Sequence, residues 1–157
     1  MADPPAEPPP TTELFERQGI HGLLDVAVVE AGPERVVLAV PVTWKVHQPY
    51  GILHGGVSAL LAESAASFGA GLSAGPGRRV VGIEISASHL RAVRGGTLTA
   101  TATPVRRGRT VQVWQIQLTD DAGRDICLAR CTLAVLAPEG AGGLEVTGRR
   151  PAPGGGN

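Results

Sequence analysis

An almost uncharged segment in the middle of the chain constrains the fold more than any other feature. From Gly55 to Pro76 the only ionisable side chain is that of Glu63. Large apolar residues recur along this segment at the spacing of one face of a helix: Val57, Leu60, Leu61, Phe68 and Leu72. The period predicts a long helix over about residues 55–73, and we expect the large apolar residues to contact the protein core.

The side of this helix that carries Glu63 is small and otherwise uncharged. Its neighbours there are Ala59, Ala62, Ala66, Ser67 and Ala70. Because a solvent-facing side is normally charged, we expect this side to be covered as well, most simply by a second copy of the chain. Partial desolvation makes a carboxylate more basic, as a catalytic base or nucleophile requires. The alternative is an exposed glutamate without a task.

Strand-like runs lie on both sides of this helix. A short helix is predicted at residues 11–19, followed by a hairpin of two strands at 23–30 and 34–42. Four more apolar runs follow the long helix and are separated by turn sequences: residues 80–90, 96–105, 109–120 and 124–137. This order predicts an α+β fold in which an antiparallel sheet surrounds a long central helix.

The ends of the chain differ from its middle in composition. Residues 1–10 are rich in Pro, and residues 138–157 are rich in Gly and Pro. Such segments cannot bury enough apolar surface to fold. We therefore expect one folded domain over residues 11–137, between two disordered ends.

Charge and hydropathy limit the class of protein. The chain has 14 Lys and Arg and 14 Asp and Glu residues, so its formal net charge is zero. This balance argues against a general surface for nucleic acid or anionic membrane. The N-terminus lacks the basic start and apolar core of a signal peptide, and we expect no apolar run of transmembrane length. The sequence thus indicates a cytoplasmic protein with neither nucleic-acid nor membrane partners.

The two cysteines indicate neither a disulfide nor a metal site. Cys127 and Cys131 lie four residues apart in a predicted strand, which separates them by roughly 13 Å, too far for a disulfide. Two thiols alone also make no zinc site. We expect two buried, reduced side chains, and neither a metal nor another cofactor.

The loop HQPYGILHGG, residues 47–56, supplies hydrogen-bond donors at the start of the helix. Gly55 and Gly56 open the helix, where backbone N–H groups are unpaired at the positive end of the dipole. A carbonyl oxygen could approach the Gly55 N–H, as in an oxyanion hole. Gln48 and His54 could add donors, although His54 could instead only cap the helix.

The spacing between His54 and Glu63 limits how they act together. Nine residues along a helix correspond to roughly 13 Å, so the two side chains of one chain cannot easily reach one reacting group. Either they have different roles, or a site combines the loop of one subunit with the helix of another. The small helix side around Glu63 favours the second arrangement.

Three stretches of the sequence resemble the hotdog-fold acyl-CoA thioesterases: HQPYGILHGGVSALLAES, VVGIEISASHLRAV and GRTVQVWQI. The resemblance covers roughly residues 22–137 and is to the PaaI-like branch, which includes thioesterases of 4-hydroxybenzoyl-CoA and 1,4-dihydroxy-2-naphthoyl-CoA. It implies a helix wrapped by an antiparallel sheet and a homodimer or homotetramer with active sites at the dimer interface. It also implies hydrolysis of an acyl-CoA, aromatic in this branch, to the free acid and CoA.

The resemblance assigns catalytic roles by position. It implies that Glu63 is the nucleophile or general base and that Ser67, one turn later, helps to place the attacking water. Gln48, His54 and Gly55 of the partner subunit would polarise the thioester carbonyl. Whether the carboxylate attacks the thioester itself or activates water stays open.

The resemblance also implies two stretches that contact CoA: Gly82 with His89, Leu90, Arg91 and Ala92, and the basic turn Arg106, Arg107, Gly108, Arg109, Thr110 and Val111. Arginines at a flexible turn suit phosphate binding, but such a turn can equally be a solvated surface. Ala92 stands where the family often has Pro, and Ser86 to Ser88 replace a more amide-rich pattern. These departures leave the identity of the acyl group open.

Three other functions are compatible with parts of the sequence. Residues 71–75, GLSAG, match the G-x-S-x-G motif of serine hydrolases, but that motif requires a preceding strand and a following helix. A hotdog dehydratase or hydratase would use a His and a carboxylate on a β-hydroxyacyl chain. A non-catalytic acyl-CoA-binding hotdog protein would not need Glu63, Gln48 and His54 together, so the sequence favours the hydrolase.

Overall fold

The computed structural model describes residues 11–17 and 19–137, so the predicted disordered ends lie outside the described residues. The elements follow the predicted order: α1 (Thr11–Arg17), α2 (Gly19–Leu23), β1 (Ala27–Ala31), β2 (Val36–Pro41), the 3₁₀ turn η1 (Trp44–Val46), α3 (Gly55–Ala74), β3 (Arg79–His89), β4 (Thr97–Arg107), β5 (Val111–Thr119) and β6 (Asp125–Leu136). The helix predicted at residues 11–19 corresponds to α1, whereas α2 was not predicted, and the first strand begins at Ala27 rather than at residue 23. The long helix over residues 55–73 is confirmed and ends one residue later.

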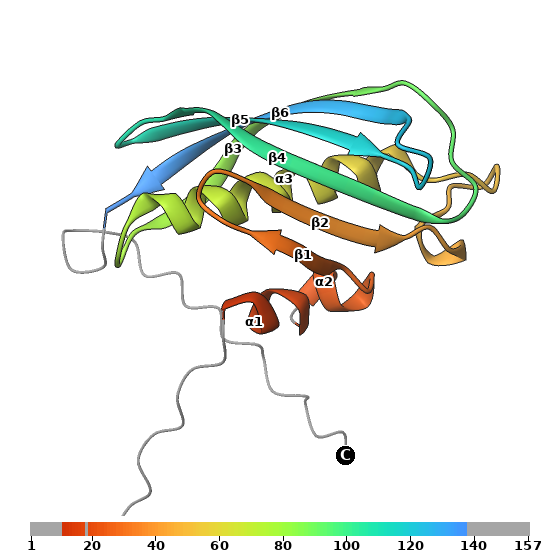
Figure 1. The fold of residues 1–157 in the computed structure, drawn as a ribbon, viewed down its shortest axis with the longest axis horizontal. Helices are drawn as coiled ribbons and strands as arrows, with labels where there is room; N and C mark the ends of the chain where they lie inside the picture. The colour runs from red at the N-terminus through yellow and green to blue at the C-terminus, as the bar shows by residue number, and fades with distance from the viewer. Residues whose placement is uncertain (1–10, 18, 138–157) are drawn as a thin grey trace, which may run out of the picture.

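The strands form one antiparallel sheet in the order β1-β2-β4-β5-β6-β3. The sheet curves over α3, which contacts β2 to β6, as Figure 1 shows. Side chains alternate between the two faces of each strand. On β5, for example, Trp114, Ile116 and Leu118 are buried against the helix side, whereas Gln115 and Gln117 are exposed on the other. The predicted α+β architecture is therefore confirmed.

The helix buries a different face from the predicted one. Leu61 and Phe68 are buried, but Leu72 is 41% exposed and Val57 and Leu60 are only partly buried. The buried positions are mostly small: Ser58, Leu61, Ala62, Ala65, Ala66, Phe68, Gly69 and Ala70. The prediction that large residues mark the core face is thus partly wrong, because the curved sheet approaches α3 closely and supplies the bulk itself.

Gly69 illustrates this close approach. A Cβ atom added to Gly69 would lie 2.5 Å from Cη2 of Trp114, which is fully buried. The indole of β5 thus fills the space that a side chain on the helix would otherwise occupy. As a result, the chain's own sheet covers Ala62, Ala66 and Ala70, for which we expected a second subunit as the cover.

The apolar residues of α3 form part of the hydrophobic core of the domain. Within the described part of the chain, α3 alone is long and apolar enough to cross a membrane by length and composition, with a mean hydropathy of 1.2. The expectation that no apolar run reaches this length is therefore wrong. Buried core helices share this property, and here strands β2 to β6 contact the helix.

Candidate active site

The Glu63 carboxylate lies against the edge strand β3. A Cβ atom added to Gly82 of β3 would overlap Oε1 of Glu63 and lie 3.0 Å from its Cδ. The strand bulges at this point, because Gly82 pairs with Leu133 and Glu84 with Thr132, which leaves Ile83 as an extra residue. Bulges are common at sheet edges and beside active sites. The absent side chain of Gly82 therefore makes room for the one carboxylate of α3.

A hollow of about 510 Å³ opens beside Glu63 on the outer side of α3. Ser67 lines it one turn after Glu63, as the resemblance implied for a water-placing hydroxyl. The N-terminal helices form its other wall, with Phe15 of α1 and His21 of α2. A second hollow of about 470 Å³ continues along the helix and shares Phe15 and Ser67 with the first. The site thus has an apolar extension next to its carboxylate.

His21 was not among the residues predicted for the site. Its Nε2 lies 2.8 Å from Oγ of Ser64, the residue after Glu63. Its ring stacks on Phe15, with centroids 4.0 Å apart, and Phe15 stacks on Phe68 of α3, with centroids 4.7 Å apart. Burial lowers the pKa of His21 below its usual value. The only signal in the sequence is a histidine within the apolar run GIHGLL.

Neither cysteine is a nucleophile of this site. Both are buried and free on the helix-facing side of β6, as expected from the sequence. Burial raises the pKa of the Cys131 thiol to about 12, and the charges of Glu63 and Glu84 add to this effect. A thiol in this state stays protonated and unreactive at neutral pH. Among the described residues, no group of three His, Cys, Asp or Glu side chains could hold a metal ion.

The loop before α3 forms a separate pocket of about 360 Å³. Gln48, Gly55 and Ser58 line it together with residues 89–92, so the structure unites two stretches that the sequence had assigned to different roles. His89 packs on the start of the helix, since a Cβ atom on Gly55 would lie 2.8 Å from its Nε2. The pocket therefore has a backbone N–H at the positive end of α3 in its wall.

The backbone of this loop is fixed by hydrogen bonds. The N–H of Gln48 donates to Ile52 O (2.8 Å), that of Leu53 donates to Val93 O (2.7 Å), and that of His54 donates to Val46 O (2.9 Å). These bonds tie the loop to the segment after β3 and to η1. The backbone at Gln48 and at His54, next to Gly55, is consequently held by the fold.

His54 caps α3, which was one of the two roles that the sequence left open. The N–H of Gly56 donates to Nδ1 of His54 over 2.9 Å. In a neutral ring this bond leaves the proton on Nε2, so the imidazole is a donor on its outer edge. Because His54 is exposed, that edge is accessible to a second molecule.

The two halves of the predicted site lie apart within one chain. The hollow beside Glu63 and Ser67 shares no lining residue with the pocket of Gln48 and Gly55. This separation agrees with the spacing argument made from the sequence. Within one chain Gly82 lies against Glu63, and residues 89–92 lie against the loop, but Glu63 and the loop residues do not line a common pocket.

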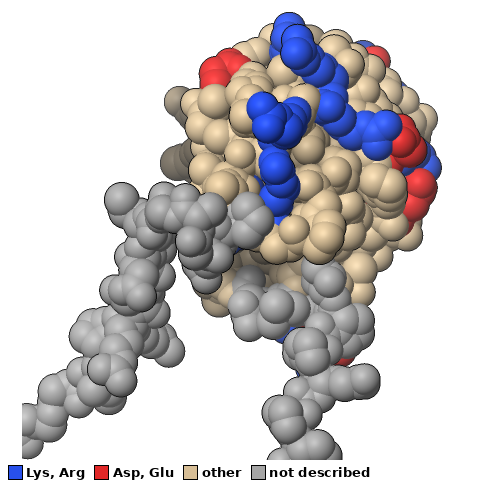
Figure 2. Space-filling model, turned by 90° about the vertical axis from the view of Figure 1, so that its left-hand side faces the viewer, with Lys and Arg blue, Asp and Glu red and all other residues tan. Residues whose placement is uncertain are grey.

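The predicted basic turn connects β4 and β5 at one end of the sheet. Lys and Arg side chains gather on the face at this end, as Figure 2 shows. Arg107 already pairs with Glu34 of the β1–β2 turn over 2.6 Å. Arg78, which the sequence did not single out, donates to the backbone carbonyl of Arg109 over 2.9 Å. Arg106 and Arg109 are both exposed, so their guanidinium groups are accessible to an anionic ligand.

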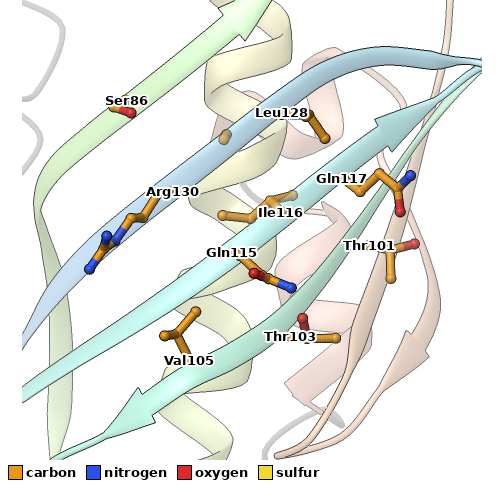
Figure 3. Close-up of a pocket in the computed structure, with 10 residues that line it drawn as sticks. Ser86, Thr101, Thr103, Val105, Gln115, Ile116, Gln117, Leu128 and Arg130 are labelled. Carbon is orange, nitrogen blue, oxygen red and sulfur yellow. The ribbon is translucent and has the colours of Figure 1, made fainter.

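A further hollow, of about 710 Å³, lies on the other face of the sheet and holds no predicted catalytic residue. Figure 3 shows its wall of Thr101, Thr103, Gln115, Gln117 and Arg130, whose side chains come from the middle strands. It has no carboxylate or imidazole in its lining. A Ser or Thr hydroxyl becomes a nucleophile only with an adjacent base, and this lining supplies none. The candidate site is therefore the one beside Glu63, on the helix side.

The serine hydrolase motif does not form a nucleophile elbow. Its Ser73 lies inside α3, with its hydroxyl 3.1 Å from Ala70 O and 3.0 Å from Oε1 of Gln112. An elbow would place the serine on a sharp turn between a strand and a helix. This alternative is therefore wrong.

Comparison with known proteins agrees with the fold and the class of enzyme. The pattern of the family described as "Thioesterase superfamily" matches residues 50–127, which include the end of the loop, α3 and the bulged strand. A 1,4-dihydroxy-2-naphthoyl-CoA hydrolase of Listeria monocytogenes is 44% identical, over 74% of this chain and 95% of that protein. The chain belongs to the thioesterase superfamily. The predicted hotdog fold and thioester hydrolase class are thereby confirmed.

Two further similar proteins are also named as thioesterases. The proofreading thioesterase EntH of Cronobacter sakazakii is 41% identical, over 72% of this chain and 82% of its own length. A crystal structure of a thioesterase from Haemophilus influenzae superposes with a TM-score of 0.76 at 38% identity, covering 80% of this chain and 87% of that one. These similarities cover the described domain rather than one motif.

Proposed function

We propose that this protein hydrolyses an acyl-CoA thioester, with an aromatic acyl group, to the free acid and CoA. The observation that carries the proposal is the placement of Glu63: a single carboxylate, seated against the Gly82 bulge, that opens into a hollow with Ser67. The names of the relatives in Listeria and Cronobacter, a naphthoyl-CoA hydrolase and a proofreading thioesterase, support a thioester substrate.

In the proposed mechanism the carbonyl oxygen of the thioester points at the start of α3. The Gly55 N–H, the Gln48 amide and the outer N–H of His54, all from the partner subunit, would stabilise the negative charge that develops on this oxygen. Their fixed backbone supports this role, because preorganised donors need no rearrangement during the reaction.

Glu63 has two chemically balanced routes to the products. As a base it takes a proton from water held by Ser67, the resulting hydroxide adds to the carbonyl carbon, the C–S bond breaks, and the proton passes to the departing thiolate. As a nucleophile it attacks the same carbon, the C–S bond breaks, and CoA leaves as the thiolate. Water then hydrolyses the resulting mixed anhydride, which frees the acid and the Glu63 carboxylate and supplies the proton that the thiolate takes up. Both routes need an ionised Glu63 within reach of the carbonyl.

The proposal requires a homodimer or homotetramer. Glu63 lines one pocket of the chain, and Gln48 and Gly55 line another. A complete site therefore takes Glu63 from one subunit and Gln48, His54 and Gly55 from another. The exposed edge strand β3, with Ile83 60% exposed beside the Glu63 bulge, provides the edge for such pairing. Light scattering should detect the assembly, and a fully active monomer would contradict the composite site.

We further propose that CoA contacts residues 89–92 beside the loop and Arg106 and Arg109 of the basic turn. Arg107 is less suited, since Glu34 already neutralises it. The position of Gly82 against Glu63 favours a steric role for this glycine over a contact with CoA. The buried, reduced cysteines support a cytoplasmic location.

Glu63→Gln tests the proposal directly. The amide keeps the volume of the side chain but is neither a base nor an anionic nucleophile, so kcat should fall by roughly two to four decades while KM changes little. Glu63→Asp, which keeps the charge but retracts it, should be intermediate. Aryl-CoA hydrolysis followed with a thiol reagent measures the rate.

Glu84→Gln is the matched control, because it removes an exposed carboxylate from the same bulge of β3. It should leave kcat within about twofold. If Glu63→Gln assembles like the wild type and keeps more than about a tenth of its kcat, Glu63 is not the catalytic carboxylate and the proposed mechanism is wrong.

A further inference from the structure

His21 and Ser64 are the polar groups of the Glu63 hollow that the proposed mechanism does not use. Apart from them, Glu63 and Ser67 are its only polar side chains among the described residues that line it. The rest of the wall is apolar or lacks a side chain, with Phe15, Ile20 and Leu60 as its large members. A pair of hydrogen-bonding groups in such a wall is a means of selecting a ligand by its polar substituents.

The imidazole of His21 is held in place by packing. It stacks on Phe15 at an interplanar angle of 20°, and Phe15 stacks on Phe68 at 9°. This three-ring stack anchors α1 and α2 on α3 and fixes the plane of the imidazole. The contact of Nε2 with Ser64 Oγ then aligns the hydroxyl, since the two atoms are 2.8 Å apart.

The acyl group of the substrate must enter this hollow. Its carbonyl carbon has to reach Glu63, and the acyl chain extends from that carbon on the side opposite to the sulfur. The hollow and its continuation past Ser67 offer about 510 and 470 Å³, which is within the range of small-ligand sites. His21 and Ser64 therefore border the space that the acyl group occupies if the proposed function holds.

The pair retains hydrogen-bonding capacity toward a ligand. Burial lowers the pKa of His21, so its ring is neutral near pH 7 and has one donor and one acceptor nitrogen. A serine hydroxyl has one donor and two acceptor positions. Even with the His21–Ser64 bond made, the serine oxygen can still accept a hydrogen bond from a hydroxyl group on the ligand.

We propose that His21 and Ser64 are specificity-determining residues that select aromatic acyl groups carrying a ring hydroxyl over unsubstituted ones. This inference rests on the proposed function and names the residues that set the substrate preference of the same site. A ring hydroxyl would donate a hydrogen bond to Ser64 Oγ, while the Ser64 O–H donates a hydrogen bond to Nε2 of His21. An unsubstituted ring forms no such bond, and a net hydrogen bond corresponds to a preference of about tenfold.

Binding is the first test, measured in the inactive Glu63→Gln protein so that no ester is consumed. Isothermal titration with benzoyl-CoA and with the 2-, 3- and 4-hydroxybenzoyl-CoA isomers gives Kd for each. We expect at least one hydroxylated isomer to bind about tenfold more tightly than benzoyl-CoA. Equal Kd values for all four esters would overturn the inference, whether or not the wild type is a hydrolase.

Substitution is the second test. His21→Phe keeps the ring stack but removes both nitrogens, and Ser64→Ala removes the hydroxyl. Each should abolish the preference for the hydroxylated ester in Kd and in kcat/KM, while both values for benzoyl-CoA change by less than about twofold. The double variant should lose no more of the preference than either single variant. Ser73→Ala removes another hydroxyl of the same helix, outside this hollow, and should leave the preference intact.

The outcomes separate the two proposals. The two variants could keep the wild-type melting temperature and yet weaken the binding of benzoyl-CoA as much as that of the hydroxylated ester. In that case His21 and Ser64 do not recognise the ring substituent, and the inference is wrong. If the wild type hydrolyses none of the four esters but the binding preference is present and lost in the variants, the inference holds and the proposed function fails.

Discussion

Gly82→Ala should damage catalysis without damaging the fold. The added Cβ atom would lie 3.0 Å from Cδ of Glu63 and overlap its Oε1. Gly82 is not one of the glycines with positive φ, so the backbone accepts alanine without strain. The only group that has to move is the end of a flexible glutamate side chain, and that group is the proposed catalytic carboxylate.

The magnitude follows from the geometry. Carbon atoms in contact are optimally about 3.5–4.0 Å apart, so the carboxylate must retreat by roughly 1 Å. A misplacement of this size can lower a rate by about two orders of magnitude. The free energy of unfolding should stay constant or rise by about 0.5–1 kcal/mol, because alanine loses less conformational freedom than glycine on folding.

The assay compares kcat with the melting temperature for the same preparation. Gly95→Ala is the control, since its Cβ atom would meet no atom within 4 Å and its φ is not positive; it should leave kcat unchanged. In a Glu63→Gln background, Gly82→Ala should cause little further loss, because both changes act on one group. A Gly82→Ala enzyme with kcat within threefold of the wild type would refute the argument that this contact positions Glu63.

Three further perturbations test the packing, the ionisation and the CoA contacts. Gly69→Ala places a Cβ atom 2.5 Å from Trp114 Cη2; the overpacking, about 1–3 kcal/mol, should outweigh the gain in helix propensity and lower the melting temperature. Because burial lowers the pKa of His21, the unfolded chain binds a proton at higher pH than the folded protein does, so this histidine should reduce the free energy of unfolding as the pH falls below about 6.5. Urea unfolding between acidic and neutral pH should show a smaller loss for His21→Gln, and an identical pH dependence would contradict the assignment. Replacing Arg106 and Arg109 together by Ala should raise KM for CoA esters about tenfold but not for esters of N-acetylcysteamine, and an equal rise for both would exclude a CoA phosphate site.

The sequence alone determined those features that depend on neighbours along the chain. Helical period and the absence of charge predicted α3, and alternating apolar runs between turn sequences predicted the strands and their order along the chain. The isolation of Glu63 within an apolar segment was enough to single it out as a candidate catalytic group. These signals are local, because the spacing of side chains along a helix or a strand is set by backbone geometry.

Tertiary structure decided which side of α3 is buried. The large residues Val57, Leu60 and Leu72 predicted the wrong core face in part, since side-chain size does not report how closely a sheet approaches. The curved sheet brings Trp114 onto Gly69, so small helix residues and a large strand residue share the core. The complementarity belongs to a pair of elements that are far apart in the sequence.

The composition of the site was also decided in three dimensions. The bulge that seats Glu63 against Gly82 depends on the register between β3 and β6, which the sequence does not encode at any one position. The contact of His21 with Ser64 joins residues 43 positions apart through a stack of aromatic rings. Long-range contacts of this kind depend on how elements pack, and packing is a property of the whole domain rather than of the residues taken in order.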